Sequence, residues 1–397
     1  IYLLEQFGLA YWLRYNSRIL PGKLTPMISR LNHVFELLPT YHLDALVLNP
    51  GPSLAYLTGL QFHLMERPTL AIFTAEGRLG LVMPELEKEK LKDVKVAVEG
   101  YLFGDDPATW PAVFAEAFGA LLKPSARVAV EPTRLRYLEM SHMRSESGTF
   151  ELVDGSELLA SIRMVKDAYE LDRMRHAARI AQQALLETLP TVRVGMTEKE
   201  IASELVIQLF RAGSDVELPF QPIVSSGPNS ANPHASPSER RLALGDLLLF
   251  DWGAAYEGYF SDITRTFTVG RVDAELERVG RLVVAANSRG REFGRAGLTA
   301  GSLDQAVREV IAQGGYGPYF THRTGHGLGM EAHEPPYIFG GNPFELQPGM
   351  TFTIEPGIYL PGRGGVRVED DVVVLPDGLE SLTNLPRDVL PLDAFWK

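Results

Sequence analysis

Four acidic residues of this 397-residue chain stand in apolar, strand-like sequence, where a charged side chain needs a partner. Asp251 ends the apolar run 247–250, and Asp262 follows it beyond a turn. Glu355 and Glu369 each follow a further short apolar segment. Burying an ionised carboxylate is costly unless it is paired. Taken alone, each aspartate is equally consistent with a residue that caps a turn, and each glutamate with a salt-bridge partner.

Three histidines accompany these carboxylates within and just after a glycine-rich segment at 322–329. They are His322, His326 and His333, and glycines flank His326 on both sides. Imidazole is a common ligand of transition metals, and glycine lets a backbone approach closely. A lone histidine is usually a core or surface residue, whereas three in such a short segment favour a functional site.

Together, four carboxylates and one imidazole predict a dinuclear metal centre. The carboxylates carry about four negative charges, which two divalent cations balance, with a bridging hydroxide completing the coordination. Oxygen-rich ligands with one nitrogen favour Mn, Co, Fe or Zn. Two ions roughly 3.5–4 Å apart can activate water and polarise a carbonyl. The predicted ligands are Asp251, Asp262, His326, Glu355 and Glu369.

The elements that must position these residues have mixed α/β patterns. Before residue 150 the sequence contains no catalytic constellation. Its apolar runs predict strands at 43–48, 70–73, 79–82, 94–98 and 128–130 and a helix at 110–122. From 158 to 189, apolar residues recur at three- and four-residue spacing and predict one long amphipathic helix that opens a second domain.

The second part of the chain continues with helices and strands. Thr197 and Glu200 form a predicted capping box at the start of a helix over 197–212. A hairpin of strands at 246–251 and 259–269 is expected to bring Asp251 and Asp262 together. The remaining patterns predict helices at 276–293 and 303–313 and strands at 350–359 and 365–374.

Composition narrows the function classes. The net charge of −12 disfavours nucleic acid or an anionic membrane as a partner. The chain has no cysteine, which excludes disulfides, a thiolate nucleophile and Cys-ligated zinc, and fits a reducing cytosol. No run reaches the roughly 18 apolar residues of a membrane span, and no signal-peptide pattern is present. We therefore expect a soluble, cytoplasmic protein.

Five segments, in order along the chain, strongly resemble the pita-bread metallopeptidase family, which includes prolidase, Xaa-Pro aminopeptidase and methionine aminopeptidase. They lie at 250–253, 261–265, 325–329, 353–357 and 366–371, and the resemblance covers about 160–390. Residues 27–150 look like a creatinase-type N-terminal domain, which methionine aminopeptidases lack. That domain points to the proline-peptidase branch.

The resemblance implies an α+β fold with two domains. A pita-bread catalytic domain is expected at 156–397, after a smaller α/β creatinase-type domain at 27–155. Residues 1–26 are interpreted either as an added extension or as a native N-terminal helix. The family also implies a homodimer and two divalent ions per subunit, with Mn first and Co or Zn as alternatives.

Site roles follow from the resemblance as well. Asp251 would bind one ion, Asp262 and Glu369 would bridge both, and His326 and Glu355 would complete the second ion's ligands. Further roles are implied for the neighbouring side chains. His333 would contact the substrate and the developing tetrahedral intermediate, and His234 and His322 would lie near the substrate. Arg367 would support the substrate or a tyrosine, and Tyr359 would belong to a proton-shuttle network. Thr264 would orient a ligating carboxylate.

The implied reaction is hydrolysis of an Xaa-Pro bond, in a small peptide with proline at its second position. The metals and Glu355 deprotonate a bridging water, which attacks the carbonyl. His333 stabilises the oxyanion, and Glu355 protonates the proline nitrogen.

A dipeptide substrate requires a cation for its carboxylate. Prolidase-like members of the family often place an arginine soon after the segment that matches 333–335, but 335–341 has no basic residue here, so Arg363 and Arg367 are the candidates. The short turn at 360–365 resembles that of small bacterial Xaa-Pro dipeptidases, so the resemblance favours an Xaa-Pro dipeptidase (prolidase). Aminopeptidase P, acting on longer peptides, is the alternative, and a non-catalytic peptide-binding member is disfavoured because all five ligands are present.

Overall fold

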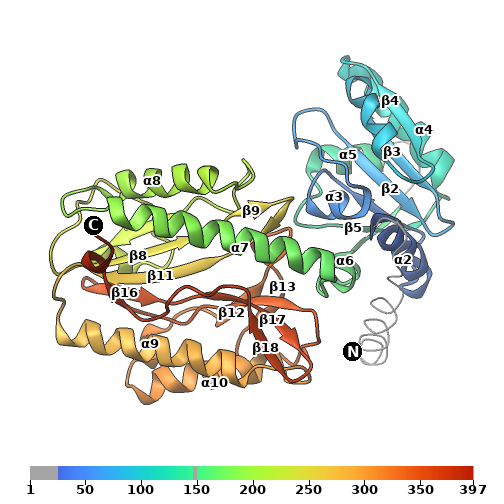
Figure 1. The fold of residues 1–397 in the computed structure, drawn as a ribbon. Helices are drawn as coiled ribbons and strands as arrows, with labels where there is room; N and C mark the ends of the chain where they lie inside the picture. Colours follow the sequence, from blue (N-terminus) through green and yellow to red (C-terminus); the bar gives the residue numbers. More distant parts are fainter. Residues whose placement is uncertain (1–25, 146–149, 397) are drawn as a thin grey trace. The chain divides into compact units, whose positions relative to one another are not determined.

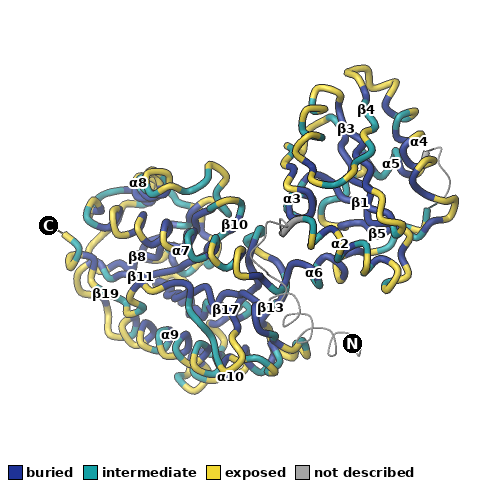
Figure 2. The backbone as a smooth tube through the Cα atoms, turned by 45° about the vertical axis from the view of Figure 1, so that its right-hand side comes forward, coloured by how far each residue is buried: buried dark blue, intermediate teal, exposed yellow. Residues whose placement is uncertain are grey.

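The computed structural model describes residues 26–145 and 150–396, which divide into two compact units between Arg163 and Met164. The domain boundary expected at 155/156 stays a prediction, and the proposed extension at 1–26 lies outside the described residues except for Pro26. Figure 2 shows buried strands in each unit, beneath helices with exposed outer faces. No helix of the described ranges is long and apolar enough to cross a membrane.

The N-terminal unit is built on a six-stranded mixed sheet. Its strand order is β4 (Glu99–Phe103), β3 (Leu79–Pro84), β2 (Leu70–Thr74), β1 (Ala45–Leu48), β5 (Arg127–Val130) and β6 (Glu151–Asp154). Its helices are α2 (Pro26–Thr40), α3 (Pro52–Thr58), α4 (Trp110–Leu121), α5 (Tyr137–Ser145) and α6 (Ser156–Arg163). Phe114 and Phe118 of α4 pack with Val47, Ile72 and Val128 of the sheet, so this unit has its own core.

The strand predicted at 94–98 is wrong. That segment is irregular, and the strand is β4, which pairs in parallel with β3. β4 is an edge strand with mostly half-exposed side chains, so its apolar pattern is weak. The other predicted strands and the helix at 110–122 correspond to observed elements.

The second unit, from Met164 onward, contains two larger sheets between two pairs of helices (Figure 1). One sheet has the order β19 (Leu390–Pro391), β11 (Ile263–Thr268), β8 (Leu247–Trp252), β7 (Ile223–Ser226). The other has the order β13 (Glu334–Ile338), β12 (Gly325–Gly327), β14 (Thr351–Ile354), β17 (Asp370–Leu375), β18 (Gly378–Ser381). Two short hairpins join β9 (Ala255–Tyr256) to β10 (Tyr259–Phe260) and β15 (Gly357–Leu360) to β16 (Gly364–Arg367).

The helices cover opposite sides of these sheets. Helices α7 (Ala168–Thr188) and α8 (Glu198–Arg211) share a hydrophobic core with β8 and β11. Helices α9 (Ala274–Phe293) and α10 (Ala300–Gln313) share a second hydrophobic core with β15 and β16, and Figure 1 shows them across the sheets from α7 and α8. The predicted capping box of Thr197 and Glu200 is confirmed at the start of α8.

The single helix predicted over 158–189 is wrong, because the chain is interrupted between α6 and α7. There Val165 forms an antiparallel bridge with Met350, and the Lys166 amide donates to the Gly349 carbonyl at 2.9 Å. Asp167 then caps α7 in a box with Glu170. An extended bridge to a distant strand therefore overrides the helical periodicity.

The two late strands expected at 350–359 and 365–374 are each divided in two. The first breaks between β14 and β15, at Glu355, and the second breaks between β16 and β17, at Glu369. The expected hairpin is formed by β8 and β11, with the small hairpin β9–β10 inserted in its connection. Each glutamate thus stands at a strand end, where its side chain is free to leave the sheet.

Candidate metal centre

The paired strands β8 and β11 supply the two aspartates. Asp251 lies opposite Thr264 in this antiparallel pair, and Asp262 immediately precedes β11. Both are buried, with 9% and 4% of their surfaces exposed. Thr264 also bridges to Glu369, which links this sheet to the other one. The pairing therefore places both aspartates beside Glu369.

The second sheet supplies the two glutamates and the histidine. β14 pairs with β17 so that Ile354 lies opposite Asp370, which leaves Glu355 and Glu369 at the same end of the two strands. His326 stands in the neighbouring strand β12. A Cβ atom on Gly325 would lie 1.8 Å from the Thr353 carbonyl oxygen, so this close approach requires glycine.

The structure brings the five predicted ligands together. Asp251, Asp262 and Glu369 form one group whose ligand atoms lie within 4.8 Å of one another. His326, Glu355 and Glu369 form a second group of the same size, so Glu369 belongs to both. Asp262 also groups with His326 and His333. Two adjacent ion sites that share carboxylates fit this arrangement.

The tautomer of His326 suits a metal ligand. Its Nδ1 lies 3.1 Å from the Gly327 carbonyl oxygen, which can only accept, so Nδ1 carries the proton. The lone pair of Nε2 is left free, 3.3 Å from Glu355 Oε1 and 3.7 Å from Asp262 Oδ2. Burial and the neighbouring His333 hold the pKa of His326 well below its usual range, so the ring is neutral.

The crowded carboxylates at this site need cations to balance their negative charge. Burial raises the pKa of Asp262 and Glu369 well above the usual range, as do the surrounding carboxylates, and burial raises the pKa of Glu355 to about 7. Oδ1 of Asp251 and Oδ1 of Asp262 are buried and accept no hydrogen bond from any described residue. Unpartnered oxygens among crowded carboxylates and one neutral imidazole fit two divalent cations.

Arg367, Tyr359 and His322 form a hydrogen-bonded chain beside the cluster. Arg367 donates to Asp251 Oδ2 at 2.5 Å and to the Tyr359 hydroxyl at 2.8 Å. Tyr359 lies 2.9 Å from Nε2 of His322, whose Nδ1 lies 2.8 Å from the Arg323 carbonyl. Burial, followed by Arg367, lowers the pKa of His322 to about 4, so Nε2 accepts the tyrosine proton.

Two threonines orient the glutamates. Thr264 donates to Glu369 Oε2 at 2.6 Å while accepting from Arg367 Nε at 3.0 Å. Thr353 donates to Glu355 Oε1 at 3.2 Å. Such outer partners fix the direction of a ligand's lone pairs. The predicted role of Thr264 has this geometry, whereas Thr353 and the role of its hydroxyl were not anticipated from the sequence.

The remaining predicted substrate residues lie in different surroundings. His333 is exposed, with its ring centroid 3.8 Å from that of His326. His234 is also exposed. Burial lowers the pKa of His333, and Arg323 lowers it further. Arg363 makes ion pairs with Asp273 and Glu275 and, among the described residues, has no polar contact with another predicted site residue.

Arg323 was overlooked in the sequence, although it stands between two of the predicted histidines. Its Nη2 lies 3.4 Å from His333 Nδ1, and its guanidinium lies 4.5 Å from the centroid of the Tyr337 ring. Within 26–145 and 150–396 it forms no ion pair with a carboxylate. Since Arg323 can only donate, His333 accepts at Nδ1 and carries its proton on Nε2.

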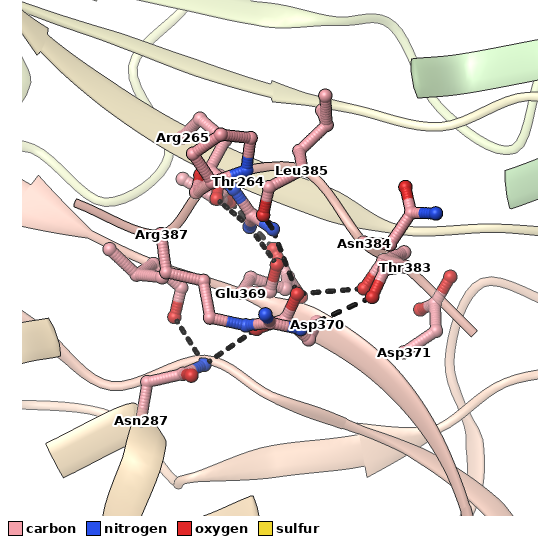
Figure 3. A network of polar contacts seen from close by, with 12 residues as sticks. Thr264, Arg265, Asn287, Glu369, Asp370, Asp371, Thr383, Asn384, Leu385 and Arg387 are labelled. Carbon is pink, nitrogen blue, oxygen red and sulfur yellow. Dashed lines mark hydrogen bonds and ion pairs between the residues drawn. The ribbon is translucent and has the colours of Figure 1, made fainter. Parts of the chain in front are cut away.

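A buried ionic network lies directly behind Glu369 (Figure 3). Asp370 accepts from Arg265 and Arg387, each at 2.8 Å, and from Thr383 at 2.7 Å. Arg265 also donates to the backbone carbonyl of Glu369 at 2.6 Å. The network therefore anchors the backbone that carries the shared ligand.

Sequence comparison places the chain in a family. Residues 172–376 match the model of metallopeptidase family M24, and residues 30–165 match the creatinase/prolidase N-terminal domain. The chain therefore belongs to metallopeptidase family M24, with a pita-bread catalytic domain and a creatinase-type N-terminal domain. The predicted family and fold class are confirmed.

Similar proteins cover nearly the whole chain. A probable dipeptidase, PepE of Mycobacterium tuberculosis, is 36% identical over 88% of this chain and 92% of its own length. An Xaa-Pro dipeptidase of Lactobacillus delbrueckii is 34% identical over 88% and 96%. The crystal structure of a dipeptidase from Pyrococcus horikoshii has a TM-score of 0.86 at 38% identity, covering 91% of this chain and 99% of that one. An X-Pro aminopeptidase structure from Thermotoga maritima has a TM-score of 0.78 at 31% identity, covering 91% and 99%.

Proposed function

We propose that this protein is a metal-dependent Xaa-Pro dipeptidase that binds two divalent cations. The observation that carries the proposal is the convergence of Asp251, Asp262, His326, Glu355 and Glu369 into two groups that share Glu369. The dipeptidase names of similar proteins support the substrate class. Mn is the first choice of metal, with Co and Zn as alternatives, because oxygen-rich ligands accept all three.

Each of the five residues would hold a cation, with Glu369 reaching both. Bound there, the ions would lower the pKa of water and polarise the scissile carbonyl. Glu355 lies 3.3 Å from His326 Nε2, and its side chain is still 14% exposed, so it contacts the cluster and keeps some access to solvent. It would accept the proton of the attacking water and transfer it to the proline nitrogen, which needs that proton to leave.

His333 and the Arg367 chain would orient the reacting groups. Because His333 carries its proton on Nε2, it can donate to an oxygen that gains negative charge. Arg367 fixes the Asp251 carboxylate, and the Tyr359 hydroxyl donates a hydrogen bond to Nε2 of His322. These contacts support roles for His333, Tyr359 and Arg367 in the reaction, and His322 is hydrogen-bonded to Tyr359.

The carboxylate of a dipeptide requires a cation near the reacting carbon. In an Xaa-Pro dipeptide three bonds separate the two carbons, so they lie roughly 4 Å apart or less. Arg367 is buried against Asp251, and Arg363 is paired with Asp273 and Glu275. Arg323 lies next to His333 and forms no ion pair with a carboxylate among the described residues. We therefore propose that its N–H groups donate to the carboxylate of the substrate.

Aminopeptidase P activity is the second candidate, because the Thermotoga maritima structure of that description is also similar. The deciding experiment compares Xaa-Pro with Xaa-Pro-Xaa peptides in added Mn. A dipeptidase cleaves the first and not the second. Efficient cleavage of the tripeptide would replace the dipeptidase proposal with the aminopeptidase one.

Variants at two arginines test how the carboxylate is held. Arg323→Ala should raise KM for the dipeptide about tenfold or more, and it should affect an Xaa-Pro amide much less. Arg363→Ala is the matched control and should leave both values unchanged. Equal losses on the acid and the amide would contradict the assignment.

A homodimer and a cytosolic location complete the proposal. The homodimer derives from the family resemblance, and the cytosolic location from the absence of cysteine. Sedimentation equilibrium of the purified protein tests the first, and cell fractionation tests the second.

A further inference from the structure

The loop from Leu328 to Glu334 carries His333 and is fastened to the rest of the unit near its start. Thr351 donates to the Leu328 carbonyl at 2.7 Å, and the Phe260 amide donates to the Gly329 carbonyl at 2.8 Å. His333 itself is exposed, and its described ring contacts are with His326 and Arg323. The position of its ring therefore depends on how the loop is held at Glu334.

Glu334 forms a buried ion pair with Lys166. Nζ of Lys166 lies 2.7 Å from Glu334 Oε1, and the two side chains are only 1% and 5% exposed. The partners are 168 residues apart in the sequence. A buried ion pair is often no more stabilising than well-packed apolar residues, so stability alone does not explain it.

Lys166 is a rigid anchor. Its backbone amide donates to the Gly349 carbonyl, the preceding Val165 bridges to Met350, and the following Asp167 caps α7. The backbone on both sides of Lys166 is therefore held in place, and the side chain extends from it to Glu334.

The ion pair also packs against the first part of the loop. A Cβ atom on Gly329 would lie 2.8 Å from Glu334 Oε1 and 3.0 Å from Lys166 Cε. The backbone at Gly329 and the carboxylate of Glu334 therefore lie close to each other, and both pack against the side chain of Lys166. Both ends of the segment that carries His333 meet at this one side chain.

We propose that Lys166 is a positioning residue for His333 and acts through its buried ion pair with Glu334. The inference rests on the proposed function, in which His333 donates to the developing oxyanion. Among the described residues, Lys166 makes no polar contact with a predicted metal ligand; its side chain contacts Glu334 and the Met164 carbonyl. Its effect is to hold the loop end so that the imidazole stays where the reacting oxygen will be.

The first test compares Lys166→Met with Lys199→Met in Mn-saturated enzyme. Lys199 is the matched control, because it forms an exposed pair with Glu239 at 2.8 Å. Since a displacement of about 1 Å can cost a hundredfold in rate, we expect Lys166→Met to lower kcat about tenfold to a hundredfold with little change in KM. Lys166→Arg should recover most of the activity, and Lys199→Met should match wild type.

A double-mutant cycle with His333→Ala separates positioning from general stability. If Lys166 acts through His333, Lys166→Met causes no further loss in the His333→Ala background. Losses that multiply, or a fall in bound Mn in the Lys166→Met protein, would overturn the proposal. If Lys166→Met fails to fold, Glu334→Gln, which keeps the shape of the side chain, replaces it in the same cycle.

A second readout does not depend on activity. In metal-free protein with labelled histidine, the His333 resonance is assigned by its loss in His333→Ala. Lys166→Met or Glu334→Gln should shift it, and Lys199→Met should not. An unmoved resonance refutes the positioning role, whereas a wild-type enzyme inactive on Xaa-Pro peptides refutes the proposed function instead.

Discussion

Replacing Asp370 with asparagine tests the network behind the metal centre. Asp370 is fully buried and paired with Arg265 and Arg387, and Arg265 in turn holds the Glu369 carbonyl. Burial raises the pKa of Asp370, but the charges of Arg265 and Arg387 and the hydrogen bonds from Arg387 and Thr383 lower it more, to about 2 from an ordinary 3.8. Asparagine has nearly the shape of the carboxylate without its charge.

The pKa depression sets the size of the effect. Nearly two pKa units correspond to roughly 2.5 kcal/mol, since one unit is about 1.4 kcal/mol. Leaving a buried arginine unpaired costs about 3–5 kcal/mol. We therefore expect Asp370→Asn to lower the free energy of unfolding by about 2–4 kcal/mol. Because the folded pKa lies below the unfolded one, this contribution is complete above about pH 4 and disappears as the pH falls through about 2.

Urea unfolding of metal-free protein, followed by circular dichroism and tryptophan fluorescence, measures this change without metal linkage. Trp252 is buried in the same unit and reports its transition. The control is Glu380→Gln, which removes a half-exposed pair with Arg175 and should cost less than about 1 kcal/mol. A loss at Asp370 as small as the control's would refute the reasoning.

Three further substitutions probe the centre itself. Thr264→Val removes the hydrogen bond to Glu369 and should weaken Mn binding about tenfold to a hundredfold in a metal titration. Tyr359→Phe removes the link between Arg367 and His322 and should lower kcat at least about tenfold while metal content stays constant; an unchanged kcat would remove Tyr359 from the mechanism. Gly325→Ala places a Cβ against the Thr353 carbonyl and should reduce soluble yield and metal content together. The amount of purified protein measures the first, and elemental analysis measures the second.

Much of the site was predictable because its chemistry is local to short segments. Charge in apolar sequence identified Asp251, Asp262, Glu355 and Glu369, and the glycine-rich segment identified His326. Pairing of adjacent elements then brings most of them together, as in the β8–β11 hairpin. Periodicity also anticipated α8, α9 and α10 closely.

Other features depend on contacts that no local pattern contains. The break before α7 arises from the bridge between Val165 and Met350, which are far apart in sequence. The pairing of Arg363 with Asp273 and Glu275 at the start of α9, and the contact of Arg323 with His333, likewise depend on tertiary packing. A spacing rule cannot show which arginine pairs with a carboxylate of the protein, so the proposal that Arg323 binds the substrate carboxylate rests on contacts seen among the described residues.

Metal stoichiometry tests the central claim most directly. Wild-type protein and Glu369→Ala are dialysed to equilibrium against excess Mn, and bound metal is counted by elemental analysis. Because Glu369 belongs to both ligand groups, two ions per chain are predicted for wild type and fewer than one for Glu369→Ala. A wild-type chain that binds one ion or none, or a Glu369→Ala chain that still binds two, would contradict the dinuclear centre.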